Sequence, residues 1–502
     1  MTALVDRIPL SQKVSGHRPW WRALVGEVLW HDVVVGLAEG RLTLVSLWGE
    51  PRTVHMAVLD DANSDIGILS LDCPERRYPS VGRLHPPAIR LERAIRDLFG
   101  LEPVGLPDQR PWLDHGRWPE RHPLGGGGPQ SHVEPYRFLP AEGEGLHQIP
   151  VGPIHAGIIE PGHFRFSVNG EVLVRLEERL GFVHKGIEGL MAEADLETAA
   201  RLAGRASGDS TVAYALAFAR AVEAAAGIEA PRRAVCLRAL MAELERVANH
   251  LGDIGAICND AAFAFLLAHF SVLRESVLRA SNACFGHRMM MDRVVPGGVS
   301  VDLDGPGEAR LAALVDAMRP QFARLVDIYD STASLKERTV STGILKPELA
   351  RQFGAGGYVG RASGRPNDAR VVPGYPPYDG IRFEVPVLHS GDVNARIWVR
   401  IREVGESLAL IEKLLAALPQ GPVRVPIAIG GRGEGGALVE SFRGDVFVWV
   451  RLGADGRVVR CHLRDPSWFQ WPLLEAAVEG NIVADFPLCN KSFNCSYSGH
   501  DG

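Results

Sequence analysis

The sequence changes character after its first quarter, and this change most constrains the fold. Short runs rich in β-branched residues occupy the first 125 residues, whereas long stretches of helical periodicity begin near residue 150. Between them, Gly125 to Gly128 and Pro129 form a glycine run of the kind that connects separate domains. The pattern predicts an α+β chain, with a small α/β domain over residues 1–125, a Gly/Pro-rich linker over 126–149 and a mainly helical domain over 150–502.

Local patterns predict the elements of both domains. The first domain has strand-like runs at 33–35, 42–47 and 54–59, followed by an amphipathic helix at 89–99 that Gly100 closes. In the second domain, residues 447–450 and 458–462 predict a peripheral β-hairpin, and residues 331–385 predict a long loop. The glycine-rich string 430–436 precedes no clear helix, so we interpret it as a flexible loop rather than a dinucleotide site. Helical periodicity is present at 171–180, 208–227, 234–256, 260–290, 307–330 and 404–418.

Charge and cysteine usage exclude several classes of function. The formal net charge is −6 and basic residues are interleaved with acids, which argues against a nucleic-acid-binding surface. The seven cysteines are scattered and form no Cys-x-x-Cys pair, so a zinc ribbon or a disulfide framework is not expected. Residues 1–30 show no secretory signal, and no run of about 20 apolar residues is present. The sequence therefore favours a reducing cytoplasm, with any membrane attachment supplied by partners.

Several strings, taken together and in order, carry a resemblance to a known family. Residues 92–100 (Glu-Arg-Ala-Ile-Arg-Asp-Leu-Phe-Gly) and 121–124 (Arg-His-Pro-Leu) resemble the accessory hydrophilic subunit of respiratory complex I. Residues 377–379 and 383–386 are similar to strings shared by the quinone-site subunit of complex I and the large subunit of formate hydrogenlyase. Further strings resemble that large subunit, at 152–155, 160–165, 181–188 and 464–469. The fused order resembles that of membrane-bound energy-converting nickel–iron hydrogenases (group 4).

The resemblance implies a fold, a setting and partners. It implies an accessory α/β domain followed by a helical domain like the large subunit of nickel–iron hydrogenases. It implies a peripheral position on the cytoplasmic face of the inner (cell) membrane, with an iron–sulfur small subunit, a ferredoxin-like subunit and antiporter-like membrane subunits as partners. It also implies that this chain is an oxidoreductase subunit that takes electrons from an iron–sulfur cluster held by a partner.

The family's metal ligands are replaced in this chain. In true hydrogenases of the family, two Cys-x-x-Cys pairs hold nickel and iron, because soft thiolates bind and bridge these metals. By the resemblance, the four ligand positions are Ala203, Ala206, Ser496 and Gly499 here; shifting the second pair by one residue would recover only Cys495. We therefore expect that this chain binds no metal or other cofactor, and that a quinone-like molecule is its candidate acceptor.

Four residues are candidates for catalysis by the same resemblance. Glu188 corresponds to a proton-relaying glutamate of hydrogenases, although a glutamate at a helix start is also favoured by the helix dipole. His155 corresponds to the first histidine of the complex I quinone loop, and the second histidine of that loop falls near Pro161 here. Asp260 corresponds to an aspartate that pairs with the quinone-site histidine, and an N-cap is the alternative. Arg443 corresponds to the arginine over the hydrogenase active site and is expected to hold an anionic ligand or Asp209, with an exposed hairpin arginine as the alternative.

Three further residues are candidates for binding the acceptor: His163, Arg205 and Asp209. His163 follows the quinone-loop string and takes the place of the missing second histidine, or is an ordinary loop residue. Arg205 lies between the two lost thiols, and a buried guanidinium needs a carboxylate, for which Asp209 or Glu188 is the expected partner. His184, Lys185 and residues 207–210 are placed in the same region by the resemblance.

Three interpretations of the function follow. The first is an oxidoreductase subunit that passes electrons to a quinone-like or unknown acceptor, coupled to ion translocation by partner subunits; the retained Glu188, Asp260 and Arg443 favour it. The second is a non-catalytic scaffold or coupling subunit of such a complex, which the missing second quinone histidine favours. The third, an active nickel–iron hydrogenase, conflicts with the replaced ligands.

Overall fold

The N-terminal domain is built on a four-stranded sheet with the order β2-β5-β4-β3. The computed structural model describes residues 4–129, 135–157, 159–428 and 432–502. In this sheet β2 runs parallel to β5, and the other neighbours are antiparallel. The strands are β2 (Trp21–Leu24), β3 (Leu42–Glu50), β4 (Thr53–Asp60) and β5 (Asp65–Asp72). Two of the predicted strands, at 42–47 and 54–59, are thereby confirmed.

Two helices pack against this sheet. The predicted strand at 33–35 is wrong, because these residues lie inside helix α1 (Glu27–Ala38). Trp30, Val33, Val34 and Leu37 are buried at helical spacing, so packing of one face outweighs the β-branched composition. Helix α2 (Ile89–Phe99) has the predicted bounds, and Gly100 ends it in the left-handed conformation with a φ of 67°.

A second sheet, with the order β1-β13-β14-β15, joins the two ends of the chain. The predicted hairpin is formed by β14 (Asp445–Leu452) and β15 (Val458–Arg464), but most of its side chains are buried, so the hairpin is internal rather than peripheral. β1 (His17–Arg18) pairs in parallel with β13 (Gly433–Glu440). The predicted flexible loop at 430–436 is therefore a strand from Gly433 onward; residues 430 and 431 lie outside the described residues.

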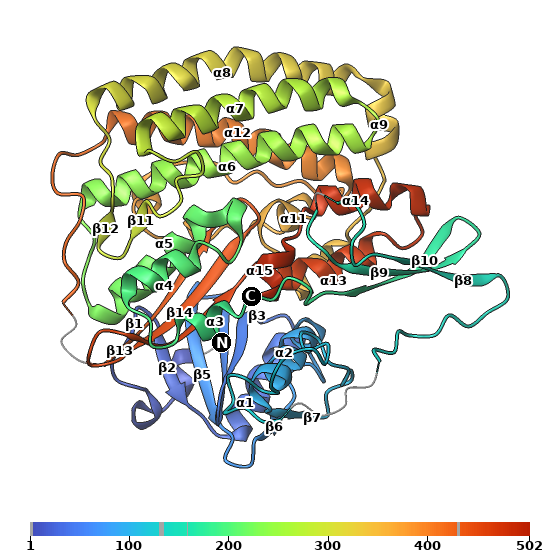
Figure 1. The fold of residues 1–502 in the computed structure, drawn as a ribbon, viewed down its shortest axis with the longest axis vertical. Coiled ribbons are helices and arrows are strands. Elements are labelled where there is room, and N and C mark those ends of the chain that lie inside the picture. Colours follow the sequence, from blue (N-terminus) through green and yellow to red (C-terminus); the bar gives the residue numbers. More distant parts are fainter. Residues whose placement is uncertain (1–3, 130–134, 158, 429–431) are drawn as a thin grey trace.

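The glycines of β13 allow a helix to lie close to this sheet. A Cβ on Gly435 would be 2.0 Å from the carbonyl oxygen of Ala221, which belongs to α5 (Thr211–Ala226). Long helices α6, α7, α8 and α12 stack beyond α5, on the side of the second sheet away from the N-terminal domain (Figure 1). Their bounds confirm the predicted helices: α6 (Arg232–Asp260), α7 (Ala264–Phe285), α8 (Gly305–Ser331) and α12 (Val393–Ala416).

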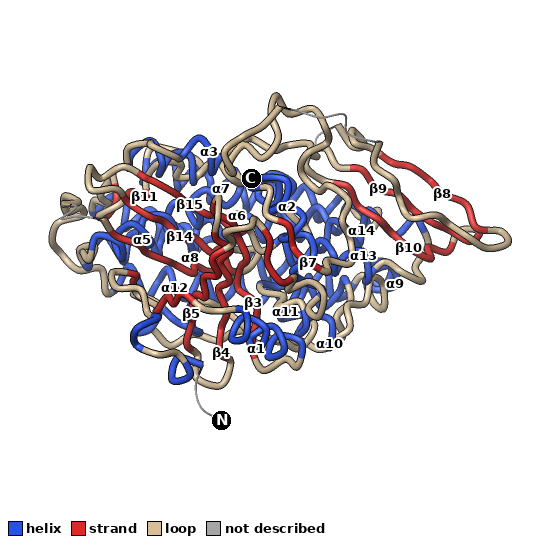
Figure 2. Tube along the Cα trace, turned by 90° about the horizontal axis from the view of Figure 1, so that it is seen from below, coloured by secondary structure: helices blue, strands red, loops and turns tan. Residues whose placement is uncertain are grey.

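Two predictions in this domain are corrected. Residues 171–180 were expected to be helical, but they form strand β10 (Val172–Arg179), which pairs with β9 (His163–Asn169). Together with β8 (Leu146–Val151) they make a three-stranded sheet that projects from the body of the molecule (Figures 1 and 2). The predicted loop at 331–385 contains the short helices α9 (Ala333–Thr339), α10 (Pro347–Gln352) and α11 (Gly357–Ala362).

Short elements complete the fold and bring distant parts of the chain together. Within the described residues, no helix combines the length and apolar character needed to cross a bilayer. The fold class, an α/β domain followed by a mainly helical domain, is as predicted. The remaining elements are β6 (Arg77–Pro79), β7 (Glu102–Val104), β11 (Val294–Val295), β12 (Gly298–Val299), α3 (Ile187–Met191), α4 (Leu196–Ala203), α13 (Ser467–Ala477), α14 (Phe486–Phe493) and α15 (Tyr497–Asp501).

Candidate functional site

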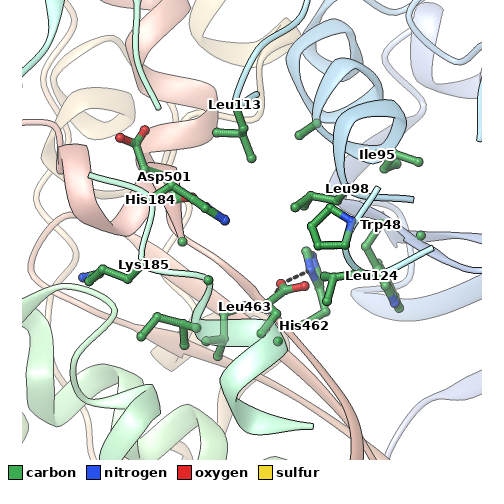
Figure 3. Close-up of a pocket in the computed structure, with 18 of the residues that line it drawn as sticks. Trp48, Ile95, Leu98, Leu113, Leu124, His184, Lys185, His462, Leu463 and Asp501 are labelled. Atoms are coloured by element: carbon green, nitrogen blue, oxygen red, sulfur yellow. Dashed lines mark hydrogen bonds and ion pairs between the residues drawn. The ribbon is translucent and has the colours of Figure 1, made fainter. Parts of the chain in front are cut away.

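A cavity of about 450 Å³ lies between the N-terminal domain and the rest of the chain (Figure 3). One wall comes from β3, from the apolar face of α2 and from residues 118–124. The opposite wall comes from the turn at 184–190, from β15 and from residues 499–502. Ala206 and Gly499, two of the positions that the resemblance aligns with metal ligands, border this cavity together with Glu188. The volume lies in the usual range for small-molecule sites.

Glu188 lines the cavity, and both of its carboxylate oxygens are bound within the chain. It lies in the first turn of α3, and its Oε1 accepts hydrogen bonds from His462 Nδ1 at 2.8 Å and from the Leu463 amide at 3.0 Å. Its Oε2 is 2.7 Å from Arg460 Nη2. Burial alone would raise the pKa of Glu188, but Arg460 and His462 outweigh it and lower the pKa to about 2. Glu188 is therefore ionised at neutral pH and holds no proton to donate.

The four positions that the resemblance aligns with metal ligands lie on two segments, and one position of each pair, Ala206 and Gly499, borders the cavity. Ala203 ends α4, and Ser496 is the N-cap of α15, where its Oγ accepts from the Gly499 amide at 2.9 Å. The Ser496 and Ser207 hydroxyls are 2.8 Å apart, which links the two segments directly. A Cβ on Gly499 would lie 2.4 Å from Asp465 Oδ2. This position therefore has no room for a cysteine without displacing Asp465.

The carboxylate of Asp465 has little freedom to move away. Its Oδ2 accepts a hydrogen bond from the Tyr214 hydroxyl at 2.7 Å, and its Oδ1 accepts from the Ser467 amide at 2.8 Å. Asp465 itself is almost completely buried. Cys495, which precedes Ser496 in the sequence, is also buried, and burial raises the pKa of this thiol well above its ordinary value.

Arg443 pairs with Asp209, as one of the sequence-based alternatives had it. Arg443 Nη1 lies 2.7 Å from Asp209 Oδ1 and Nη2 lies 2.5 Å from Oδ2, which makes a bidentate contact. Burial alone would raise the pKa of Asp209, but Arg443 lowers it to about 2. Arg443 Nη1 also donates to the Ser210 hydroxyl at 3.2 Å, and neither Arg443 nor Asp209 lines the cavity.

The expected partners of Arg205 are wrong. Arg205 forms a bidentate pair with Asp292 instead of Asp209 or Glu188, and its side chain is 39% exposed. The hydrogen bond to Asp292 raises the pKa of Arg205. Since water reaches the guanidinium, Arg205 does not need a buried partner.

His155 lies on the segment that joins β8 to β9, and His163 is the first residue of β9. His155 is half-buried with its ring centre 6.2 Å from that of Tyr497, and His163 Nδ1 is 3.3 Å from the Gly152 oxygen. Burial lowers the pKa of both histidines. On the same segment, Glu160 accepts a hydrogen bond from the Ser498 amide at 3.0 Å, so the segment is tied to α15.

Asp260 is the last residue of α6 and not the N-cap of α7, which is Phe263. Burial raises its pKa. His250, ten residues earlier, contacts Glu403 at 2.7 Å rather than Asp260. Of the four catalytic candidates, only Glu188 lines the cavity, and its described contacts are with Arg460, His462 and the Leu463 amide rather than with the other three.

Most of the groups that shape the cavity were not predicted from the sequence. Arg460 and His462 lie on the predicted hairpin, but their burial depends on the packing of β15 against β3: His462 stacks on Trp48 with ring centres 5.0 Å apart. His500 and Asp501 lie in the C-terminal tail, where the resemblance pointed only to metal-ligand positions. Within the described ranges, no three His, Cys, Asp or Glu side chains gather closely enough to hold a metal ion.

Comparisons with known proteins agree with this architecture. Residues 47–128 match the model of the respiratory-chain NADH dehydrogenase 30 kDa subunit, and residues 260–429 match that of the 49 kDa subunit. Formate hydrogenlyase subunit 5 of Escherichia coli (strain K12) is 34% identical over 453 residues, which cover 86% of this chain and 78% of the relative. An NADH-quinone oxidoreductase subunit from Bacteroides thetaiotaomicron is 29% identical, with 81% of this chain and 82% of the relative covered.

A solved structure has a similar fold. A chain of the membrane-bound sulfane sulfur reductase, an archaeal respiratory membrane complex, superposes with a TM-score of 0.67 at 26% identity, covering 72% of this chain and 99% of its own length. The chain therefore belongs to the family of large subunits that respiratory NADH dehydrogenases share with formate hydrogenlyase and related hydrogenases, with the 30 kDa and 49 kDa portions fused in one polypeptide.

Proposed function

We propose that this chain is the metal-free large subunit of a membrane-associated respiratory complex. In the proposal it passes electrons from an adjacent iron–sulfur subunit to a quinone-like organic acceptor. One relative bears the name of an NADH-quinone oxidoreductase, and the superposed structure is a respiratory membrane complex. Those names support an electron-transfer role for this chain.

The chemistry of the ligand positions supports the metal-free state. Nickel and iron need soft thiolate ligands, and alanine, serine and glycine side chains cannot replace them. Gly499 adds a steric argument, because a side chain there meets the buried Asp465. The residues of this chain therefore do not fit a nickel–iron centre, and we derive no step through one.

The cavity beside the replaced ligands is the observation that carries the proposal. Its walls are mostly apolar, from Leu98, Leu124 and Leu463 among others, and a few polar groups converge on it. Such a combination suits a small, mainly apolar organic molecule. The metal ligands are lost at one edge, and a cavity large enough for a ligand lies beside them. Both features fit an organic electron acceptor in place of the nickel–iron centre.

The setting follows from the family. We propose a peripheral position on the cytoplasmic face of the membrane, with an iron–sulfur small subunit, a ferredoxin-like subunit and antiporter-like membrane subunits as partners. Ion translocation then takes place in those membrane subunits and is coupled to electron transfer through this chain.

A second candidate function is a scaffold without catalysis. The ion pairs Glu188–Arg460 and Asp209–Arg443 are satisfied within the chain, which favours a structural role for these residues. The quinone-loop residue His155 is also not gathered with the other candidates into the cavity. These contacts are what a scaffold needs to stay rigid.

Purification of the whole complex separates the two candidates. We expect no stoichiometric nickel, no hydrogen evolution, and reduction of a soluble quinone at the expense of the natural electron donor. Leu124→Trp fills the cavity from a partly buried loop position and is expected to abolish quinone reduction, whereas Val28→Trp, at a side chain that is 80% exposed, should not. If the complex reduces no quinone, or if both variants reduce quinone at the same rate, the electron-transfer role is contradicted and the scaffold function remains.

A further inference from the structure

Four charged side chains around the cavity, those of Lys185, Glu188, Arg460 and Asp501, are already bound to other parts of the chain. Glu188 is held by Arg460, His462 and the Leu463 amide. Lys185 Nζ donates to the carbonyl oxygens of Arg205 and Ala206 at 2.6 and 2.9 Å, and its side chain points away from the cavity (Figure 3). An ionic ligand would find no free counter-charge among these groups, which favours an uncharged one.

Asp501 and two of the cavity histidines are bound in the same way. Asp501 Oδ1 and Oδ2 accept from the amides of Gly181 and Val183 at 2.9 and 3.0 Å.

His500 lies between the Asp501 carboxylate and the indole of Trp112, so both of its nitrogens have partners. His462 likewise lies between Glu188 and the Ser46 hydroxyl, 2.8 Å from each. Neither histidine can give a proton to a ligand without breaking an internal hydrogen bond.

His184 differs from these groups. Its Nδ1 is 2.7 Å from the backbone carbonyl oxygen of Asp501. A carbonyl oxygen only accepts, so Nδ1 carries a hydrogen and Nε2 is the nitrogen left for exchange with a ligand. The ring points toward the centre of the cavity (Figure 3), and within the described part of the chain Nε2 has no hydrogen-bond partner.

The N-terminal domain fixes the orientation of this ring. The indole of Trp118 stacks on the imidazole of His184 with ring centres 4.8 Å apart and an angle of 29° between the planes. The hydrogen bond on one side of the ring and the stack on its face together leave His184 one orientation. The stack also places the aromatic surface of Trp118 beside the His184 ring, and a flat ligand can pack against such a surface.

We infer that His184, and not Glu188, exchanges the proton with the acceptor bound in this cavity, and that the acceptor is a flat, uncharged molecule with a carbonyl oxygen. The inference rests on the proposed function, which supplies quinones as the class. Two electrons from the partner's iron–sulfur centre and two protons convert the two carbonyl groups of a quinone to hydroxyl groups. The protonated His184 gives one proton from Nε2 and becomes a neutral imidazole, which takes a proton from water again; the second proton comes from water.

Other charged and titratable groups surround His184 on several elements. They are Lys185 and Glu188 on its own turn, Arg460 and His462 on β15, His500 and Asp501 on α15, and Glu120 on the segment beside Trp118. The contacts described above hold Lys185, Glu188, Arg460, His462, His500 and Asp501 within the chain. Glu120 is exposed to solvent, and His184 is therefore the group to substitute.

The test uses the purified complex with menadione as the quinone and compares two substitutions of the same kind. His184→Gln keeps a donor for the Asp501 carbonyl but cannot exchange a proton, and we expect turnover to fall about 100-fold or more with KM within about threefold of wild type. His115→Gln is the matched control, because His115 is held by the Leu180 oxygen at 2.7 Å and does not line the cavity. Its turnover should stay within about twofold of wild type.

A second measurement locates the ligand without turnover. Diethyl pyrocarbonate modifies accessible histidines, and mass spectrometry then reports the modification of each one. Bound menadione should protect His184 and leave the modification of His155 unchanged. Protection of His155 alone, or normal turnover of the His184→Gln complex, would overturn this inference; absence of quinone reduction by the wild-type complex overturns the proposed function instead.

Discussion

Replacement of Glu188 by glutamine removes the counter-charge of Arg460 and should cost about 3 kcal/mol of unfolding free energy at pH 7. Glu188 and Arg460 have side chains only 16% and 10% exposed, so solvent screening is weak. Lowering the pKa of Glu188 from its ordinary 4.5 to about 2 corresponds to about 3 kcal/mol. Removing one partner of a buried ion pair costs about 3–5 kcal/mol in general, which agrees with that figure.

The contribution of Glu188 to the free energy of unfolding depends on pH in a definite direction. Because the folded-state pKa of Glu188 is lowered, its contribution is fully present above pH 4.5 and is lost as the pH falls toward 2. The difference in stability between wild type and Glu188→Gln should therefore be constant from about pH 7 to about pH 5 and shrink below about pH 4.

The assay is guanidinium chloride unfolding of both proteins at several pH values, followed by near-ultraviolet circular dichroism. Glu197→Gln is the matched control, because Glu197 and its partner Arg201 are 68% and 58% exposed. This substitution should lower the free energy of unfolding by less than about 0.5 kcal/mol. The multi-domain chain need not unfold in one step, so the comparison between the two variants is the relevant quantity. Equal destabilisation by the two substitutions would refute the reasoning.

Three further substitutions probe other contacts of the chain. Gly499→Ala should destabilise the protein by about 1–3 kcal/mol, since its Cβ would meet the bound carboxylate of Asp465, and a thermal melt within about 1 °C of wild type would contradict this. Gly435→Ala should cost about 3 kcal/mol or more, because the clash is with the backbone of α5; normal yield and melting would show that β13 can move. Arg205→Met should cost less than about 1 kcal/mol in the same melts, because its pair with Asp292 is partly exposed, and a larger loss would restore a buried role for Arg205.

Periodicity predicted the elements whose packing is simple. The helix at 89–99 and the long helices of the second domain have strong patterns and clear ends, and the structure confirms them. The helix predicted at 171–180 from periodicity is wrong, although Glu177, Glu178 and Arg179 are strong helix formers. In the structure these charged side chains are buried and form ion pairs and ring contacts. One of these contacts is the ion pair of Glu178 with Arg90 of the N-terminal domain, which no local pattern reveals. The strand predicted at 33–35 is wrong for the opposite reason, because Val33 and Val34 are buried on a helix together with Trp30.

The sequence predicted part of the candidate site. It did not predict the contacts between residues that are far apart in the chain. The resemblance located Glu188, and Asp209 was named among the expected partners of Arg443. The resemblance could not identify Arg460 and His462 as partners of Glu188, because they lie more than 270 residues away from Glu188 in the chain. Arg205 was given the wrong partner because its burial was assumed, whereas its exposure depends on the loop that carries Asp292. His184 was placed in the right region, but the stacked Trp118 that orients it comes from the other domain.

Both the proposed function and the role of His184 require that the positions at 203, 206, 496 and 499 no longer bind a nickel–iron centre. Nickel and iron quantification on the purified complex tests this, combined with an experimental density map of the space between residues 203–206 and 496–499. We expect no nickel beyond trace amounts and no heavy atoms in that space, with iron accounted for by the partner's clusters. One nickel per chain, with two adjacent heavy atoms between these segments, would contradict both proposals.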